Sequence, residues 1–121
     1  MTKNIAMRSG GEILVDQLLV HGVDTAFCVP GESYLDVLNA LSLKKNQIKL
    51  IVTRQDGGAS FMAEAYGKAT GRPGICFVTR GPGATNASIG VHTASQDSSP
   101  MVLFVGQVGG DMVEREAFQA V

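Results

Sequence analysis

The chain contains 121 residues, of which 45% are hydrophobic and 17% are charged, and its formal net charge is −1. This composition is typical of one ordered globular domain and excludes a disordered chain, which would be poorer in apolar residues and richer in charge. Basic runs are no longer than two residues, and no apolar stretch approaches the roughly 20 residues that span a bilayer, so we expect neither nucleic-acid nor membrane binding.

The first part of the chain predicts a helix, a strand and a second helix. Ser9 and Glu12 have the spacing of a capping box, and the apolar residues that follow recur at helical spacing. This pattern predicts a helix over residues 9–21. A short β-prone run then predicts a strand at 25–29. Ser33 is expected to cap the next helix.

The same alternation of strands and helices continues along the rest of the chain. Further apolar runs predict three strands, at residues 48–53, 75–78 and 101–105. Segments rich in alanine and small polar residues predict one helix that extends through Lys68 and another over 84–95. Residues 111–121 have the pattern of the start of a further helix.

Strands that are almost continuously apolar and alternate with helices predict an α/β fold. We expect an open parallel sheet with helices on both faces. At 121 residues the chain forms at most one domain, and it reaches its last residue without an obvious closing strand. We therefore expect residues 1–121 to be part of a longer protein, with the domain ending before the last strands of its sheet.

The two cysteines are expected to be structural. Cys28 and Cys76 both lie inside apolar, strand-like runs and have no neighbouring cysteine or histidine at a metal-ligand spacing. We expect free, buried thiols, as in proteins of a reducing compartment. The N-terminal residues lack the apolar core of a secretory signal, and together these features predict a cytoplasmic protein.

The four strand ends carry the candidate site. Parallel strands end at the same edge of a sheet, where ligands meet helix N-termini and closely approaching glycines. The loops at this edge are Pro30-Gly31-Glu32, Arg54-Gln55-Asp56, Arg80-Gly81-Pro82-Gly83 and Gly106-Gln107. The third loop has neither the lysine of a P-loop nor the third glycine of a dinucleotide fingerprint, so a nucleotide phosphate is not its expected ligand.

Each of these residues also has a purely structural interpretation. The glycines can serve the strand-to-helix turns alone. Asp56 can cap the helix that follows it, and Glu32 can complement the dipole of its helix. The residue pattern by itself leaves the structural and functional interpretations open.

The basic residues and histidines of the chain allow similar alternatives. Arg54 and Arg80 each follow a threonine at a strand end, where an arginine can bind an anion. The same geometry would serve ion pairing with Glu64, Asp97 or a partner chain. The two histidines have no paired ligand or nucleophile and are expected to be non-catalytic; they are His21 and His92.

Three segments, taken in order, resemble a known family. They are Val29-Pro30-Gly31-Glu32, the run from Arg54 to Gly67, and the run Thr79-Arg80-Gly81-Pro82-Gly83-Ala84-Thr85-Asn86. Together they closely resemble the N-terminal, pyrimidine-binding domain of thiamine diphosphate enzymes of the acetolactate synthase and pyruvate decarboxylase type. The resemblance extends from about Ser9 through Phe118, and the ordered set of motifs is much more specific than any one of them.

The resemblance assigns a catalytic and cofactor-binding role to Asp56. In the family a glutamate at this position hydrogen-bonds the aminopyrimidine ring of the cofactor and promotes loss of the thiazolium proton. Asp56 keeps the acid but is one methylene shorter. We therefore expect either a closer backbone or a longer bond to the ring, and a misplacement of ~1 Å can slow a reaction about 10²-fold.

Further site residues follow from the same resemblance. Cofactor-binding roles are implied for the residues that shape the pyrimidine pocket, namely Pro30, Gly31, Gly81, Pro82, Gly83 and Asn86. Glu32 is expected to face the substrate region, and Gln107 is expected to border the same cleft, so both are predicted to be catalytic. No metal ligand is assigned within the chain.

The resemblance implies one half of an active site rather than a complete enzyme. The implied activity is decarboxylation of a 2-oxo acid such as pyruvate, with transfer of the two-carbon unit to a carbonyl acceptor, a transferase or lyase reaction of the acetolactate synthase type. Thiamine diphosphate is the implied cofactor. Mg²⁺ is expected on a domain outside this chain, because no Gly-Asp-Gly segment with a downstream Asn occurs here. The resemblance also allows FAD in the complete enzyme.

The implied partner is a second subunit. We expect a homodimer or homotetramer that assembles through the interface between pyrimidine-binding and diphosphate-binding domains, and we expect the 121 residues alone to be inactive. The alternative is a non-catalytic α/β domain that binds a small molecule or another protein, in which Asp56 caps a helix and the glycines turn the chain.

Overall fold

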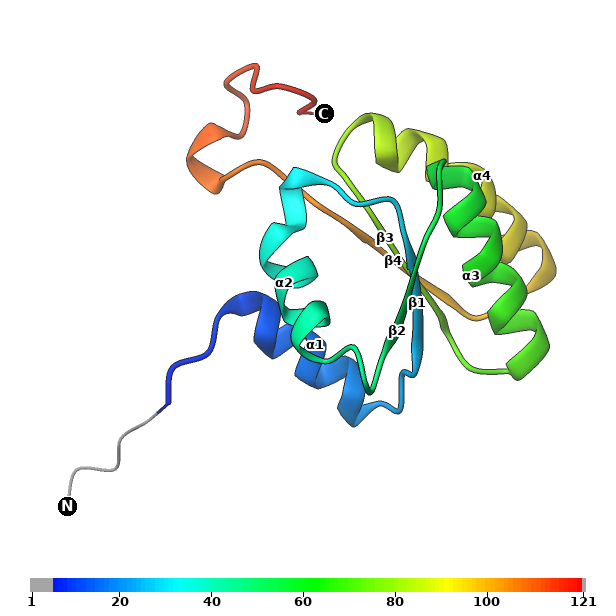
Figure 1. Cartoon of the computed structure of the whole chain (residues 1–121). Helices are drawn as coiled ribbons and strands as arrows, with labels where there is room; N and C mark the ends of the chain where they lie inside the picture. Colours follow the sequence, from blue (N-terminus) through cyan, green and yellow to red (C-terminus); the bar gives the residue numbers. More distant parts are fainter. Residues whose placement is uncertain (1–5, 121) are drawn as a thin grey trace.

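A computed structural model describes residues 6–120 (Figure 1). Four α-helices alternate with four strands along the chain. The helices are α1 (Gly10–Val20), α2 (Leu35–Leu43), α3 (Asp56–Thr70) and α4 (Pro82–Asp97). The strands are β1 (Thr25–Cys28), β2 (Lys49–Val52), β3 (Gly74–Val78) and β4 (Met101–Val105). Two short 3₁₀ turns follow β1 and β4, at Glu32–Tyr34 and Gly110–Met112.

The strands form one parallel sheet in the order β2-β1-β3-β4. The chain passes from β1 to its neighbour β2 and then returns across β1 to β3, so the direction of winding reverses between β1 and β3. Helices α1 and α2 lie on one face of the sheet, and α3 and α4 lie together on the other (Figure 1). The expected α/β class, with a parallel sheet and helices on both faces, is confirmed.

Two buried clusters hold the helical layers to the sheet. The cluster under α1 and α2 is built around Val15, Leu41 and Phe77. The cluster under α3 and α4 is built around Phe27, Cys76 and Val78, against alanines of both helices. Strand β3 is buried along its whole length and contributes side chains to both clusters, which places it at the centre of the molecule.

The layer formed by α3 and α4 is packed through small side chains. Its buried residues include Ala59, Ser60 and Ala63 on α3, and Ala87 and Gly90 on α4. A Cβ on Gly90 would lie 2.5 Å from the Cβ of Ser60 and 2.7 Å from its carbonyl carbon, closer than packed atoms approach. The two helices therefore touch at a point where no side chain separates their backbones.

The capping box predicted for the first helix is confirmed. The Ser9 hydroxyl accepts the Glu12 N–H at 3.1 Å, and the Glu12 carboxylate accepts the Ser9 N–H at 2.9 Å. The observed helix, α1, lies within the predicted range of residues 9–21. Because the sequence places both partners of this cap three residues apart, the helix start could be derived from local chemistry alone.

Two other predictions were wrong, and one predicted helix is two residues longer at each end. Ser33 does not cap α2, because it lies inside the 3₁₀ turn and its hydroxyl contacts Thr79 instead. The helix predicted over residues 84–95 begins earlier, with Pro82 in its first turn, and ends at Asp97. Over residues 111–120 the structure has only the end of the short 3₁₀ turn, followed by turns, in place of a further helix.

Both thiols are free and buried, as expected. Burial is the largest cause that raises the pKa of Cys76, to about 12, and it also raises the pKa of Cys28. Both groups are therefore protonated near neutral pH. None of the helices in residues 6–120 combines the length and the apolar composition that a bilayer span requires.

Candidate functional site

The loops that follow β1 and β3 touch at the carboxyl edge of the sheet. A Cβ on Gly31 would lie 2.6 Å from the Cβ of Thr79, and the Ser33 and Thr79 hydroxyls are 2.8 Å apart. Gly31 has an extended backbone, with φ −146°, so a glycine is required here by space and not by conformation. Ligands of open α/β sheets bind at this point, where the winding reverses.

Asp56 begins α3 at this edge and is buried, with a relative exposure of 9%. The structural interpretation of Asp56 as the helix cap was wrong, because the Gln55 side chain is the cap and accepts the Gly58 N–H at 3.0 Å. The Asp56 carboxylate is thereby left for other contacts. Its Oδ2 lies 3.5 Å from the Asn86 side-chain nitrogen on α4.

The other carboxylate oxygen of Asp56 is unpartnered. Among the described residues, Oδ1 of Asp56 is the buried side-chain polar atom that has no hydrogen-bond partner. A buried acceptor without a donor costs about 1–3 kcal/mol, so such atoms mark strained or ligand-binding positions. The geometry suits a ligand that brings an N–H or O–H donor to this oxygen.

Gly83 is buried and packs tightly beside this oxygen. A Cβ on Gly83 would lie 3.2 Å from Asp56 Oδ1 and 2.9 Å from the Thr79 methyl carbon. Gly81, two residues earlier, has φ +57°, a conformation that favours glycine. The residue between them, Pro82, is exposed and occupies the first turn of α4, where its missing N–H costs nothing.

Glu32 and Arg80 form an ion pair across the two touching loops. The Nη2 of Arg80 donates to Glu32 Oε1 at 2.8 Å, and its Nε donates to the Phe118 carbonyl oxygen at 2.8 Å. Glu64 and Asp97, the acids considered for Arg80 from the sequence, both pair with Lys68 instead. The sequence pattern alone could not select Glu32, because that choice depends on the register between β1 and β3.

The remaining predicted residues lie along the same edge. Pro30 is exposed after β1, and Asn86 is exposed apart from its contact with Asp56. Gln107 follows β4, where its Oε1 accepts the N–H of Val108 at 2.8 Å. It lines a pocket of about 290 Å³ together with Ser33 and Tyr34 of the 3₁₀ turn after β1 and Phe104 of β4.

Ser33, Thr79 and Tyr34 organise the edge and were not singled out as site residues from the sequence. The Ser33 hydroxyl bonds Thr79 and also accepts the Arg80 N–H at 3.3 Å. The Tyr34 hydroxyl donates to the Val29 carbonyl oxygen, its ring stacks on Phe77, and burial raises its pKa above the usual range. The available sequence signals were a threonine at the end of one strand and a serine after another, but such residues are common in loops of every kind.

With this geometry in view, the chain can be compared with known proteins. Residues 8–121 match the family described as thiamine pyrophosphate enzyme, N-terminal TPP binding domain. The chain belongs to this family. Thiamine pyrophosphate is the same compound as thiamine diphosphate, so the resemblance stated from the sequence is confirmed.

Three relatives show where in the family the chain lies. It is 43% identical over 113 residues to an acetolactate synthase large subunit of Parasynechococcus marenigrum, covering 92% of this chain and 18% of the relative. It is 41% identical over 112 residues to the chloroplastic acetolactate synthase of Arabidopsis thaliana, covering 93% and 17%. It is 41% identical over 111 residues to an acetolactate synthase large subunit of Buchnera aphidicola subsp. Acyrthosiphon pisum, covering 92% and 19%.

The chain therefore spans less than a fifth of the length of these relatives. The residues at the carboxyl edge fit the cofactor of the family. A thiamine pyrophosphate-binding domain needs a buried acceptor for the aminopyrimidine, and Asp56 Oδ1 is an unpartnered acceptor of this kind. Gly83, which has no side chain, lets the start of α4 pack directly against Asp56 and Thr79 and so holds this acceptor in place.

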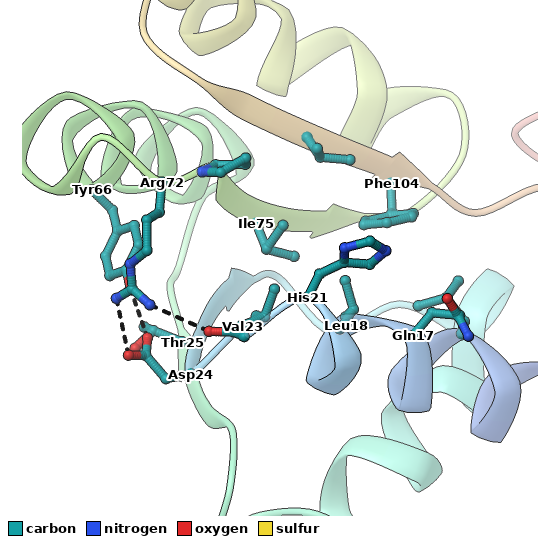
Figure 2. Close-up of a pocket in the computed structure, with 14 residues that line it drawn as sticks. Gln17, Leu18, His21, Val23, Asp24, Thr25, Tyr66, Arg72, Ile75 and Phe104 are labelled. Carbon is teal, nitrogen blue, oxygen red and sulfur yellow. Dashed lines mark hydrogen bonds and ion pairs between the residues drawn. The ribbon is translucent and has the colours of Figure 1, made fainter.

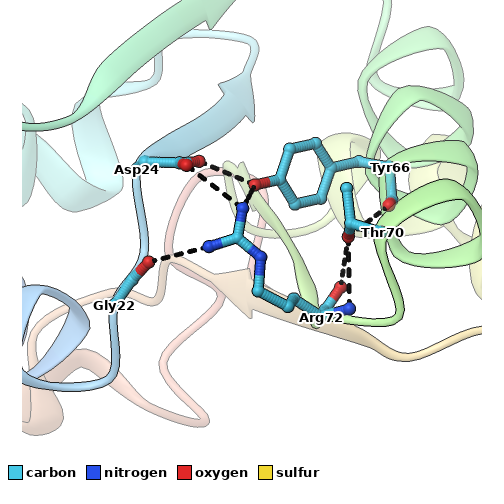
Figure 3. Close-up of polar contacts among 5 residues, drawn as sticks. All are labelled: Gly22, Asp24, Tyr66, Thr70 and Arg72. Carbon is cyan, nitrogen blue, oxygen red and sulfur yellow. Dashed lines mark hydrogen bonds and ion pairs between the residues drawn. The ribbon is translucent and has the colours of Figure 1, made fainter.

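This thiamine pyrophosphate-binding domain has a second hollow, at the opposite, amino edge of the sheet. Figure 2 shows a pocket of about 560 Å³ between α1 and strands β3 and β4, with Leu18, Ile75 and Phe104 among its apolar lining residues. The polar groups at its rim bind one another: Arg72 donates to Asp24 at 3.1 Å and to the Tyr66 hydroxyl at 2.7 Å (Figure 3). Although this hollow is larger, the unpartnered carboxylate lies at the other edge, and that edge is the candidate site.

Proposed function

We propose that this chain forms the pyrimidine-binding half of the active site in a thiamine diphosphate-dependent enzyme of the acetolactate synthase type. The proposed reaction decarboxylates a 2-oxo acid such as pyruvate and transfers the two-carbon unit to a carbonyl acceptor. The observation that carries the proposal is the buried, unpartnered Oδ1 of Asp56, against which Gly83 packs. Membership of the family and the acetolactate synthase relatives support it.

Asp56 would act through a hydrogen bond in a site with little water. Its Oδ1 would bind a ring nitrogen of the aminopyrimidine through a proton held between them, because the neutral ring carries no N–H of its own, while Asn86 steadies Oδ2 from α4. A fixed group in a buried site forms a stronger hydrogen bond than one in water, and no reorganisation is needed when the ligand arrives. Gly31 and Gly83 would shape the pocket by letting the loop after β1 and the start of α4 pack closely against Thr79.

The reactive chemistry would come from the cofactor. When bound, thiamine diphosphate supplies a nucleophilic carbon that adds to the 2-oxo group and accepts the electrons released as CO₂ leaves. This chain would bind and orient the ring and control a proton at Asp56 Oδ1. Mg²⁺ and the diphosphate would be held by another part of the enzyme, and FAD in the complete enzyme remains within the proposal.

A second subunit would complete the site. Large apolar side chains are partly exposed on the outer helices, among them Phe61 and Met62 on α3 and Ile89 on α4. Exposed apolar surface of this kind is typical of protein interfaces. We therefore propose a homodimer or homotetramer in which this helical layer takes part in subunit contact.

The decisive experiment is a calorimetric titration of thiamine diphosphate into the complete protein that carries this chain, for the wild type and Asp56→Asn. Asparagine keeps the shape but loses the charge and part of the acceptor capacity. We expect at least about tenfold weaker cofactor binding, because hydrogen bonds to charged groups contribute about 1.5–3 kcal/mol. The free energy of unfolding without cofactor should stay equal or rise, since a buried charge without a partner is removed.

The matched control is Asp111→Asn, which neutralises an exposed aspartate on the 3₁₀ turn after β4. It should leave cofactor affinity unchanged. Equal cofactor affinity in the Asp56→Asn protein and the wild type would contradict the proposed role of Asp56 and favour the alternative of a non-catalytic α/β binding domain.

A further inference from the structure

The guanidinium of Arg80 is held in place at the edge that contains Asp56. Only 11% of its side chain is exposed, and it is anchored by donation to the Phe118 carbonyl oxygen at 2.8 Å. The backbone N–H of the same residue donates to the Ser33 hydroxyl at 3.3 Å. Loop, side chain and anchor are therefore fixed together, as a preorganised binding group requires.

The acid that faces Arg80 is far less constrained. The Glu32 side chain is 64% exposed, and among the described residues it forms one hydrogen bond, to Arg80 at 2.8 Å. An exposed carboxylate gains little from such a pair, because water screens the charge and holding the side chain costs entropy. Glu32 can therefore leave Arg80 at small cost when another carboxylate takes its place.

We infer that Arg80 is the residue that receives the carboxylate of the 2-oxo acid, and that Glu32 occupies this position when substrate is absent. The inference rests on the proposed function and adds the group that selects an acidic substrate. A guanidinium has five N–H donors in a planar fork that matches a carboxylate, and the bonds to Phe118 and Glu32 use two of them.

The position of Arg80 in the chain agrees with this role. Arg80 lies in the loop after β3, three residues before Gly83, which is in the first turn of α4 and packs beside Asp56 Oδ1. Three residues of chain reach at most about 11 Å, so the Cα atoms of Arg80 and Gly83 lie within that distance at the same edge of the sheet. Arg54, the other arginine at this edge, is exposed, so solvent would screen its attraction for an anion.

The test uses methyl acetylphosphonate, an anion shaped like pyruvate that cannot lose CO₂, titrated calorimetrically into the complete protein. Arg80→Met should weaken its binding at least about tenfold, since a charge-assisted contact is lost. The affinity of Arg80→Lys for the probe should lie between those of the wild type and Arg80→Met, because a lysine keeps the charge without the planar fork. Lys49→Gln removes an exposed charge at the amino edge and should leave affinity for the probe unchanged.

A second variant tests the exchange itself. Glu32→Gln removes the competing charge and should tighten binding of the probe several-fold, whereas a purely structural ion pair would leave it unchanged or weaker. In steady-state assays Arg80→Met should raise the KM for pyruvate by a larger factor than it lowers kcat. Because Glu32→Gln leaves Arg80 in place, this arm stays informative even if Arg80→Met does not fold.

A thiamine diphosphate titration of the same proteins separates this inference from the proposed function. Arg80→Met should retain cofactor affinity within about threefold while losing affinity for the probe. Undetectable binding of the probe to the wild type, or equal binding to Arg80→Met, would overturn the assignment of Arg80. Absence of cofactor binding in the wild type would instead overturn the proposed function.

Discussion

The site depends on a single residue, Asp56, whose carboxylate has an oxygen without a hydrogen-bond donor within residues 6–120. Asp56 has the position of a helix cap, yet Gln55 satisfies the Gly58 N–H and the Asp56 carboxylate turns into the interior. Asn86 approaches one oxygen of this carboxylate at 3.5 Å, and the other oxygen remains without a donor. A buried acceptor without a donor destabilises the unliganded fold. A ligand that supplies the donor removes this cost, which favours binding.

Gly83 offers a test of the position of this carboxylate. We predict that Gly83→Ala weakens thiamine diphosphate binding at least about tenfold, because its methyl group would lie 3.2 Å from Asp56 Oδ1 and displace the carboxylate that binds the ring. Stability should change by less than about 1 kcal/mol, since the better helix propensity of alanine in α4 offsets the contact with Thr79. Calorimetric titration and urea unfolding measure the two effects.

The control for this substitution is Gly58→Ala, in the first turn of α3 and two residues from Asp56. A Cβ on Gly58 would have no neighbour within 4 Å. Cofactor affinity should therefore match the wild type, with stability equal or up to about 1 kcal/mol higher. If Gly83→Ala bound cofactor as well as the wild type, the close packing of Gly83 on Asp56 would have no role in binding.

At the scale of elements, the sequence correctly predicted those helices and strands that depend on neighbouring residues alone. The first helix was derived correctly because both partners of its cap are three residues apart, at Ser9 and Glu12. Strand β4 was predicted at residues 101–105 and observed at Met101–Val105, because a continuous apolar run needs no distant partner to be recognised.

The errors arose where a distant residue decided the outcome. Ser33 has the composition of a cap, but Thr79, 46 positions away in the sequence, takes its hydroxyl. The same holds at the site, where Glu32 and Arg80 are joined only through the pairing of β1 with β3. The four loops could be assigned to one edge from the parallel pattern, but the contacts between them could not.

The contact between α3 and α4 gives a prediction at this scale. Gly90→Ala should lower the free energy of unfolding by about 1–3 kcal/mol, because its Cβ would lie 2.5 Å from the Cβ of Ser60 and 2.7 Å from its backbone carbonyl carbon. Alanine gains roughly 1 kcal/mol in helix propensity over glycine, which is too little to offset such an overlap. Urea denaturation at neutral pH measures the difference.

Gly10→Ala is the matched control, because Gly10 begins α1 and a Cβ there would meet nothing within 4 Å. Only the propensity gain should remain, and the variant should be as stable as the wild type or slightly more. A Gly90→Ala protein of wild-type stability would show that the two helices can separate slightly at no cost.

For the whole molecule, the two edges of the sheet have different roles. At the carboxyl edge the acidic group of Asp56 is buried and incompletely bonded. At the amino edge the polar groups are exposed and bond one another, joining the turn before β1, helix α3 and the turn before β3 (Figure 3). Ligand chemistry is thus placed at one edge, while the other ties segments of both helical layers together.

Acid titration tests this second role. Hydrogen bonds from Tyr66, at 2.6 Å, and from Arg72 lower the pKa of Asp24 from 3.8 to about 2. A carboxyl group with a lowered folded-state pKa stabilises the fold above its unfolded-state pKa, near 4, and this contribution is lost as pH falls toward 2. Because the pair is half-exposed, we expect Asp24→Asn to cost only about 0.5–1 kcal/mol at pH 7.

The difference between Asp24→Asn and the wild type should therefore be constant from pH 7 to about pH 5 and should shrink between pH 4 and pH 2. Urea denaturation across this range measures it, and the difference between the two proteins cancels the titration of the other carboxylates they share. Asp111→Asn, which lies outside the network, should show no such trend. A difference that persists undiminished at pH 2 would mean that the charge of Asp24 does not hold the network together, and that its shape and neutral hydrogen bonds do.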